Sequence, residues 1–541
     1  MHHVLRRTAA VLAVPALSLT ALGALPSPAG AATIDAAPAT AGAAWLAGQV
    51  PASGLFPSDY GLQYGLGIDI ALGLHAVGGQ ADAVTRIRDA VEAGVDDYIA
   101  YSYVDDQNVT HTGEVGGATA KVLVLSQRIG GDENAFGGVD LVKRMESLVA
   151  DSGRVISTAD GAPDDSYDNS YIQALAVEGL RGTGSAAYAD VVDYLLDQQC
   201  ADGYFRGEIP AAPGAQSCAG DAPDTDSTAQ AVLALAADQG TPGVQEALAK
   251  AEAWLLEAQR PNGSFGGGPT TEAPNADSTG LAGWALGTLG ETDAAADAAA
   301  WVRAHQAANV SSCGYYAAAD LGAIAYDGAA LRAVQSTPID AATQGQFLLA
   351  SAQALPVLQW APAGSGDPHA LFAAEYVKAG GRKPVGVIGA APGEALCAKL
   401  GEQSVLGYAN RNGEAQLRVR IPSTTGKSRV AVANAAGAVG TVTINALGAK
   451  KLTLRYPSRV AARTKLVIKV KGLAPGETAS VNITWPSRAG SGSGEASGGQ
   501  ANRKGVFVVH TKVPRRPGKA TIHARGQFAN RKAGGTFTVT R

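Results

Sequence analysis

A repeated turn constrains the fold of this chain more than any other feature. Several segments that read as helices end in glutamine, pass through a glycine turn and then place an aromatic residue. The copies lie at 45–56, 194–205, 254–265 and 301–316, with a more degraded copy at 141–156. Their turn glycines, Gly153, Gly203, Gly263 and Gly314, are separated by 50, 60 and 51 residues. A period of this length indicates a repeat architecture.

The helices on either side of each turn differ in character. Those after the turns are rich in Ala and Leu and apolar on most faces, as in 226–240 and 277–290, so they must be buried. Those before the turns are amphipathic, as in 244–259. A ring of buried helices wrapped by half-exposed ones satisfies both patterns. We predict an (α/α)6 toroid of six helical hairpins over 33–360, with the sixth buried helix at 326–335 and a closing helix at 339–360.

The sequence changes in texture after about residue 384. Short segments alternate apolar and polar residues between Gly, Pro and Ser turns, as in TKLVIKVKGL at 464–473. This pattern predicts antiparallel β-sandwich modules. We divide the region into a small β module at 384–448 and an Ig-like β-sandwich at 449–541. The Gly- and Ser-rich stretch 488–505 predicts a flexible loop between strands.

The first residues have the features of a secretory signal peptide. Arg6 and Arg7 precede an apolar run from Ala9 to Leu25, and a small-residue cleavage site follows at 29–31. The run is short for a membrane span, which needs about 20 apolar residues, and no comparable run occurs later. We therefore expect residues 1–31 to be removed. The mature protein would be secreted, without a transmembrane segment, or held at the cell envelope by non-covalent contacts.

Charge divides the chain into two parts. Residues 33–381 contain 14 Lys or Arg and 43 Asp or Glu, whereas 382–541 contain 27 and 5. A basic module on an exported protein suggests an anionic partner, such as a cell-wall polymer or an acidic polysaccharide. The alternatives are a surface that aids solubility or one that docks on the acidic half. The candidate contact residues are Lys465, Lys469, Lys471, Arg515, Arg516 and Lys519.

Four cysteines, Cys200, Cys218, Cys313 and Cys397, allow three disulfide pairings in an oxidising compartment. Cys200 and Cys218 bracket one loop, which favours their pairing and leaves Cys313 for Cys397. No CxxC spacing is present, and the histidines are scattered. We therefore expect neither a structural zinc site nor another metal, and no cofactor.

The stretch DAPDTDSTAQAVLALA at 221–236 raises the functional question. The pattern Ala-Pro-(Asp/Asn)…Ser recurs at 162–170, 222–227 and 273–278. Helix capping and the helix dipole explain one acid or amide in each copy. They do not explain why three neighbouring repeats each bring two or more polar groups to the same end of the ring.

We therefore predict a polar rim around one mouth of the toroid. Its members would be Asp168, Asn169, Asp224, Asp226, Asn275 and Asp277. Candidates for its wall are Tyr64, Tyr167, Tyr171 and Trp284. Core packing explains these aromatic residues equally well. A rim of acids, amides and aromatic rings suits a polar organic ligand, a sugar or a cation.

The repeat also carries a resemblance. Gln-x3-Gly-x-aromatic, as in Gln259…Gly263…Phe265, is similar to the QW repeat of the α/α-toroid superfamily of terpenoid cyclases and protein prenyltransferases. Together with 167–177, 224–235 and 275–286, it resembles secreted actinobacterial proteins that contain prenyltransferase/squalene oxidase repeats. The resemblance covers about residues 40–360 and is specific for fold.

For function the resemblance implies one residue. Asp226 matches the proton-donating aspartate of the class II cyclase acid motif, but Ser227 replaces the last aspartate of that motif. We expect an exported protein whose toroid captures a small molecule or glycan and whose basic β region contacts an anionic envelope polymer, without nucleic acid. The alternative is a toroid-cavity enzyme. It would be terpene-cyclase-like with Asp226 as general acid, or carbohydrate-active with Asp168 and Asp226 as its acid–base pair.

Overall fold

The computed structural model describes residues 33–164, 168–210, 218, 221–308, 310, 313–372, 374–487 and 494–541. The predicted signal peptide and Tyr167 lie outside this part of the chain.

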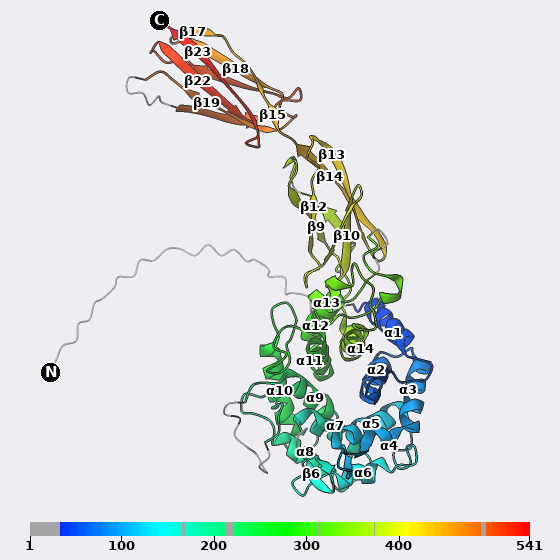
Figure 1. The fold of residues 1–541 in the computed structure, drawn as a ribbon. Coiled ribbons are helices and arrows are strands. Elements are labelled where there is room, and N and C mark those ends of the chain that lie inside the picture. Colours follow the sequence, from blue (N-terminus) through cyan, green and yellow to red (C-terminus); the bar gives the residue numbers. More distant parts are fainter. Residues whose placement is uncertain are drawn as a thin grey trace, which may run out of the picture. The chain divides into compact units, whose positions relative to one another are not determined.

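In the described residues, six largely buried helices form the inner ring of a toroid (Figure 1). They are α2 (Tyr64–Val77), α5 (Gly116–Ile129), α7 (Ser170–Leu180), α9 (Thr225–Leu235), α11 (Ala276–Leu289) and α14 (Gln344–Ala354). Each packs against the next, and α14 packs against α2, which closes the ring. Ala and Gly permit the close approach: a Cβ atom built on Gly73 would lie 2.5 Å from the Ala352 carbonyl oxygen.

An outer layer covers the inner ring. Its helices are α1 (Ala37–Gln49), α3 (Ala81–Ala93), α4 (Val95–Ile99), α6 (Leu141–Ser147), α8 (Tyr188–Leu196), α10 (Val244–Ala258) and α12 (Thr292–Ala304). Helix α10 buries Val244, Ala247, Leu248, Ala251 and Leu255, which recur at helical spacing on one face. The two textures seen in the sequence thus correspond to two layers.

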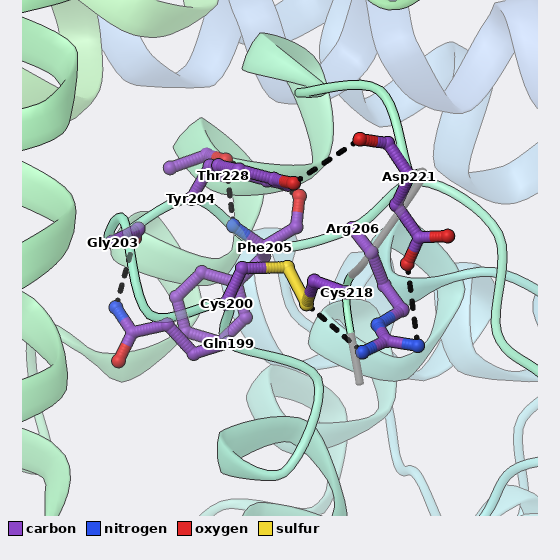
Figure 2. Close-up of a disulfide and its surroundings, with 9 residues drawn as sticks. All are labelled: Gln199, Cys200, Gly203, Tyr204, Phe205, Arg206, Cys218, Asp221 and Thr228. Carbon is purple, nitrogen blue, oxygen red and sulfur yellow. Dashed lines mark hydrogen bonds and ion pairs between the residues drawn. A yellow bond between two sulfur atoms is a disulfide. The ribbon is translucent and has the colours of Figure 1, made fainter. Parts of the chain in front are cut away.

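The repeated turn fastens neighbouring hairpins together. Gln199 Nε2 donates to the Gly203 carbonyl within its own turn, at 2.9 Å, and to the Ala247 carbonyl of α10, at 2.8 Å. Figure 2 shows the bond from Gln199 to Gly203. Gly203 has a φ of +104°, and a Cβ atom there would meet the Lys250 carbonyl of α10. Gln259 makes the equivalent bonds to Gly263 and to Ala294 of α12. In these two turns the glutamine therefore joins one hairpin to the next.

Two details of the predicted repeat are wrong. The fourth turn uses Gly322, to which Gln306 Nε2 donates at 3.1 Å, and not Gly314, because an inserted stretch around Cys313 lengthens this turn. The segment expected as the sixth inner helix contains only the short helix α13 (Gly328–Ala333). Helix α14 takes that place and continues into the 3-10 helix η2 (Leu355–Trp360).

Short strands and one further 3-10 helix lie in the connections between the helices of the toroid. They are β1 (Pro57–Ser58), β2 (Gly61–Leu62), β3 (Ala100–Val104), β4 (Thr110–Glu114), β5 (Ser157–Ala159), β6 (Ala162–Asp164) and η1 (Ala318–Asp320). The strands pair as the hairpin β1–β2 and as the antiparallel sheet β3-β4-β5-β6.

A first β-sandwich follows the toroid. One sheet has the order β11-β10-β13-β14-β8 and the other β12-β9-β7. The strands are β7 (His369–Leu371), β8 (Val377–Lys378), β9 (Arg382–Ile388), β10 (Ala395–Leu400), β11 (Gln403–Tyr408), β12 (Ala415–Arg420), β13 (Gly426–Asn434) and β14 (Gly437–Leu447). Alternate residues of β12 are buried, as the sequence pattern predicts. The first strand begins at His369, before the expected start at 384.

The chain then forms a second β-sandwich. Strands β15-β23-β22-β19-β20, with β17 beside β23, face the sheet β16-β18-β21 across a shared hydrophobic core. They are β15 (Lys450–Lys451), β16 (Thr453–Arg455), β17 (Arg459–Ala461), β18 (Lys465–Lys471), β19 (Thr478–Thr484), β20 (Gly494–Gln500), β21 (Val506–Lys512), β22 (Gly518–Arg525) and β23 (Arg531–Thr540). The predicted loop 488–505 thus contains a strand, β20.

Disulfides link Cys200 to Cys218 and Cys313 to Cys397, the pairing that the spacing favours. The second bridge ties the toroid to strand β10. Among the helices of the described residues, none combines the length and the hydrophobicity that crossing a membrane requires.

Candidate functional site

The first turns of α7, α9 and α11 hold most of the predicted rim. In each helix the residue before the first turn caps it by accepting a hydrogen bond, at 2.8–2.9 Å, from the backbone N–H three residues later. The pairs are Asn169 with Ile172, Asp224 with Ser227, and Asn275 with Ser278. The capping interpretation is therefore correct for one polar residue of each pair.

The second polar residue has a different position. Asp226 and Asp277 occupy the second helical position of α9 and α11, where Tyr171 stands in α7. Both acids are half-buried, and their Oδ1 atoms are fully buried. Within the described residues, no hydrogen-bond partner reaches either Oδ1 atom. These two carboxyl groups are not needed for capping. A buried oxygen without a hydrogen-bond partner is unusual, so we regard both acids as functional candidates.

The two carboxyl groups titrate abnormally. Burial raises the pKa of Asp226 to about 6, although a hydrogen bond from Ser278 acts in the opposite direction. Burial and the neighbouring charge of Asp226 raise the pKa of Asp277 to about 7. The charge of Asp224 adds to the shift at Asp226, as the charge of Asp226 does at Asp277, so the titrations of these neighbouring acids are coupled. Near neutral pH this pair retains a proton that it could donate.

Two tyrosines lie near the acid pair. Burial raises the pKa of the Tyr171 hydroxyl, and the charges of Asp69 and Asp226 add to the shift. Burial raises the pKa of Tyr326, and Asp277 and Asp226 raise it further. Both hydroxyl groups therefore stay protonated at neutral pH and can donate hydrogen bonds close to the pair.

Asp226 faces a pocket of about 640 Å³ at the helix N-termini. The polar residues of its wall are Asn169, Tyr171, Arg206, Glu208, Asp221, Asp224, Asp226, Ser227, Thr270 and Thr271. We call this hollow the mouth pocket. Its size is within the range of about 300–1,000 Å³ that is usual for organic ligands.

A glycine-rich loop brings backbone close to the acids. A Cβ atom at Gly267 would lie 2.7 Å from Asp226 Oδ2 and 2.9 Å from Ser278 Oγ. One at Gly268 would lie 2.3 Å from Asp224 Oδ2. Only glycine fits these positions without displacing the carboxyl groups.

Figure 2 shows the disulfide Cys200–Cys218 together with Arg206 and Asp221, which line the mouth pocket. Arg206 is almost fully buried; its Nη1 lies 3.4 Å from Asp221 Oδ2, and its Nη2 lies 2.9 Å from Cys218 Sγ. Cys200, Cys218 and Asp221 form a cluster with metal-ligand atom types, but the disulfide engages both sulfur atoms. This cluster therefore does not hold a metal ion as it stands.

The central cavity of the ring is much smaller. It has a volume of about 60 Å³, and every inner helix contributes to its wall, with Asp69, Lys121, Tyr171, Leu233, Trp284 and Ala352 among the lining residues. Lys121 Nζ lies 2.7 Å from Asp69 Oδ1, and Arg128 pairs with Glu178. The ring therefore encloses a small cavity, and two ion pairs lie in the wall of that cavity.

The remaining predicted residues have other partners or positions. Asp168 is buried and pairs with Arg154 Nε at 3.1 Å, so it does not join Asp226. Tyr64 is buried and stacks on Tyr98, with ring centroids 5.4 Å apart. Asn275 is buried as a cap, and Trp284 lines the central cavity.

Sequence reasoning missed several charged residues of the interior. Asp69, Lys121 and Glu178 are flanked by apolar residues within their helices, and Arg206 and Glu208 follow a repeat turn. An isolated charge in a helix that must be buried is a signal that could have found the first three, because such a charge needs a partner or a function.

Neither the family models nor the curated proteins include a match to this chain. Solved structures do resemble it. The apo structure of the type II terpene cyclase MstE from Scytonema is 14% identical, with a TM-score of 0.42, and the match covers 60% of this chain and 96% of the cyclase. An unsaturated glucuronyl hydrolase from Bacillus sp. GL1 is 12% identical, with a TM-score of 0.38, over 58% of this chain and 95% of the hydrolase. At this level of identity the likeness concerns the fold alone.

Proposed function

We propose that the toroid binds a small polar organic ligand, either cationic or rich in hydroxyl groups, in the mouth pocket. The observation that carries this proposal is Asp226, a half-buried acid that lines the mouth pocket and is not needed as a helix cap. Asp277 does not line the pocket and acts through its charge coupling to Asp226. A ligand ammonium or hydroxyl group in the pocket would bond to the accessible part of the Asp226 carboxyl group. It would also offset the cost of holding carboxyl groups away from water.

The sizes of the two hollows support this location. The central cavity, at about 60 Å³, is far below the usual volume of an organic-ligand site, and its ion pairs suit no long apolar chain. The mouth pocket, at about 640 Å³, has room for a ligand of one or two sugar rings. The polyprenyl substrate of a terpene cyclase is therefore the less favoured ligand.

A second candidate function is acid catalysis on such a ligand. It is favoured by the pKa values of about 6 and about 7, which leave a proton on the pair near neutral pH. Asp226 would act as general acid in this case. A carbohydrate-active enzyme would use it to protonate a leaving group, with Asp277 and not Asp168 as the second carboxyl.

Native mass spectrometry of the protein purified from its host tests ligand capture. We expect an additional mass that survives gentle desolvation and disappears in the double variant Asp226→Asn/Asp277→Asn. Asp293→Asn is the matched control, because Asp293 is also in the first turn of a helix but is exposed. Retention of the same mass by the double variant would exclude the acid pair as the binding site. Release of a chemically altered ligand would favour the enzyme.

We also propose that the chain belongs with the secreted prenyltransferase/squalene oxidase repeat proteins that it resembles. Export is supported by the signal-peptide features of residues 1–31 and by the two disulfides. The basic β region would then contact an anionic polymer of the cell envelope. Fractionation of the host culture tests export, and recovery of the full-length chain in the cytoplasm would exclude it.

A further inference from the structure

A row of positive charges crosses one sheet of the second β-sandwich. Lys451 of β15 is paired in register with Lys532 of β23, and Lys532 is paired with Arg525 of β22. The three strands are neighbours in the sheet (Figure 1), so the three side chains stand side by side on one face. All three residues are exposed. Neighbouring strands lie about 4.8 Å apart, which sets the spacing of the backbone positions from which the row extends.

The row lies along a hollow of about 700 Å³. Lys451, Arg525 and Lys532 line it, together with His523, which is opposite Gly534 in the register of β22 and β23. Because Gly534 has no side chain, the face is open beside His523. We call this hollow the cationic groove.

Carboxylates that could neutralise the row are absent from the described residues of this sandwich. Residues 449–541 contain only two acids in the sequence, Glu477 and Glu495. Glu477 is buried in an ion pair with Arg531, and Glu495 accepts hydrogen bonds from Trp485 and Thr511. No carboxyl group is among the residues that line the groove.

Without an anionic ligand, the row of three positive charges destabilises the folded sheet by electrostatic repulsion. Like charges directly opposite on neighbouring strands repel each other, and this row contains two such contacts. Three positive charges in a line suit a linear ligand that carries a negative charge at regular intervals. They suit a single compact anion less well, because the charges do not converge on one point.

We propose that the cationic groove binds an acidic polysaccharide that carries one carboxylate on each sugar. The spacing of the row is close to the length of one pyranose ring, so successive carboxylates could meet Lys451, Lys532 and Arg525 in turn. The planar guanidinium group of Arg525 can bind a carboxylate through two parallel hydrogen bonds. A polymer of alditol phosphates carries its charges at wider intervals and matches the row less well.

This inference deepens the proposed contact with an anionic envelope polymer by naming its site and the class of polymer. The site differs from the one expected from the sequence. Lys465, Lys469 and Lys471 lie on β18, in the opposite sheet, and alternate with buried residues. They are likewise exposed, but none of them lines the groove.

The test compares two triple variants of the full chain. Lys451→Gln/Arg525→Gln/Lys532→Gln removes the row, and Lys465→Gln/Lys469→Gln/Lys471→Gln removes the same charge from the other sheet. Binding to polygalacturonate is measured by isothermal titration calorimetry, with a glycerol phosphate polymer and neutral dextran as comparison probes. We expect the first variant to lose about tenfold in affinity, since exposed charge pairs each contribute roughly 0.5 kcal/mol, and the second to change less than about twofold.

Each other outcome overturns a defined part of the proposal. Equal losses in both triple variants would show that net charge and not the groove governs binding. Preference of the wild type for the phosphate polymer would overturn the carboxylate class. If neither anionic polymer binds, the envelope contact fails together with the groove, while ligand capture by the toroid stands on its own test. The single variant Lys532→Gln, at the centre of the row, should lose part of the affinity with an unchanged urea unfolding curve, and a shifted curve in either triple variant would assign its loss to unfolding.

Discussion

The mouth pocket and the cationic groove gather charges of opposite sign by different means. At the pocket, the first turn of α9 holds Asp226 half-buried, the first turn of α11 holds Asp277 half-buried behind it, and burial raises both pKa values. In the groove, strand register places Lys451, Lys532 and Arg525 side by side in solvent. Buried charge is sensitive to protonation, whereas exposed charge is sensitive to screening by salt. The two sites should therefore respond to different conditions.

Local backbone geometry strengthens this contrast. A helix N-terminus favours a negative charge nearby, which would lower the pKa of an acid in the first turn. The pKa values of Asp226 and Asp277 are nevertheless raised, so desolvation outweighs the helix dipole at this site. A β-sheet has only a small net dipole, so it does little to offset the repulsion within the row.

The largest expected effect is a pH-dependent gain in stability on removal of one acid. In the unfolded chain an aspartate has a pKa of about 3.9. Because Asp277 has a pKa of about 7 in the folded protein, folding favours its neutral form. Its stabilising contribution is complete below about pH 4 and is lost as the pH rises through about 7. Asp277→Asn should raise the free energy of unfolding at about pH 8 by at most about 4 kcal/mol, and much less at about pH 5.

Urea unfolding followed by tryptophan fluorescence measures this difference, since five of the six tryptophans belong to residues 33–360. Asp293→Asn, which removes an exposed acid from the first turn of α12, should change the free energy of unfolding little at either pH. A wild type more stable than Asp277→Asn at pH 8 would mean that the carboxylate is ionised and held by a partner.

A smaller effect is expected from salt, and it should separate the two sites. Raising the salt concentration from about 50 to about 200 mM should weaken polygalacturonate binding at the groove by about tenfold. Binding releases counterions from the polyanion, and added salt opposes that release and screens the exposed charges. Ligand binding at the acid pair should change less, since buried charges are screened less. Calorimetry of both interactions in the same buffers provides the comparison. Equal salt dependence at the two sites would contradict the distinction between buried and exposed charge.

Much of the fold could be predicted from the sequence because its signals are local and repeated. The Gln–Gly–aromatic turn and the two helix textures predict the two-layered toroid, and period-two alternation predicts strands such as β12. The errors occur where such signals fail. The inserted stretch at Cys313 moves the fourth turn to Gly322. Strand β20 consists largely of Gly and Ser and forms because β19 supplies its backbone hydrogen bonds.

The candidate site was only partly predictable. Capping positions can be read from a single helix, so Asn169, Asp224 and Asn275 were identifiable. Which second polar residue is buried depends on the neighbouring repeat. The charge of Asp226 on α9 raises the pKa of Asp277 on α11, whereas Asp168 forms an ion pair with Arg154. The cationic groove depends on strand register, which alternation alone does not give.

The smallest expected effect tests whether capping and function are separate within one motif. Asp224→Ala removes the acceptor for the Ser227 N–H and should lower the free energy of unfolding by about 1 kcal/mol, at all pH values between about 5 and 8. Asp224→Asn keeps a capping oxygen and should be close to neutral. Asp226→Asn should not destabilise the toroid, because Asp226 caps no backbone group and folding already favours its neutral form. If Asp226→Asn instead costs about as much as Asp224→Ala at every pH, then Asp226 is part of the cap. Asp224 and Asp226 would then both have a structural role, and there would be no reason to place a ligand beside Asp226.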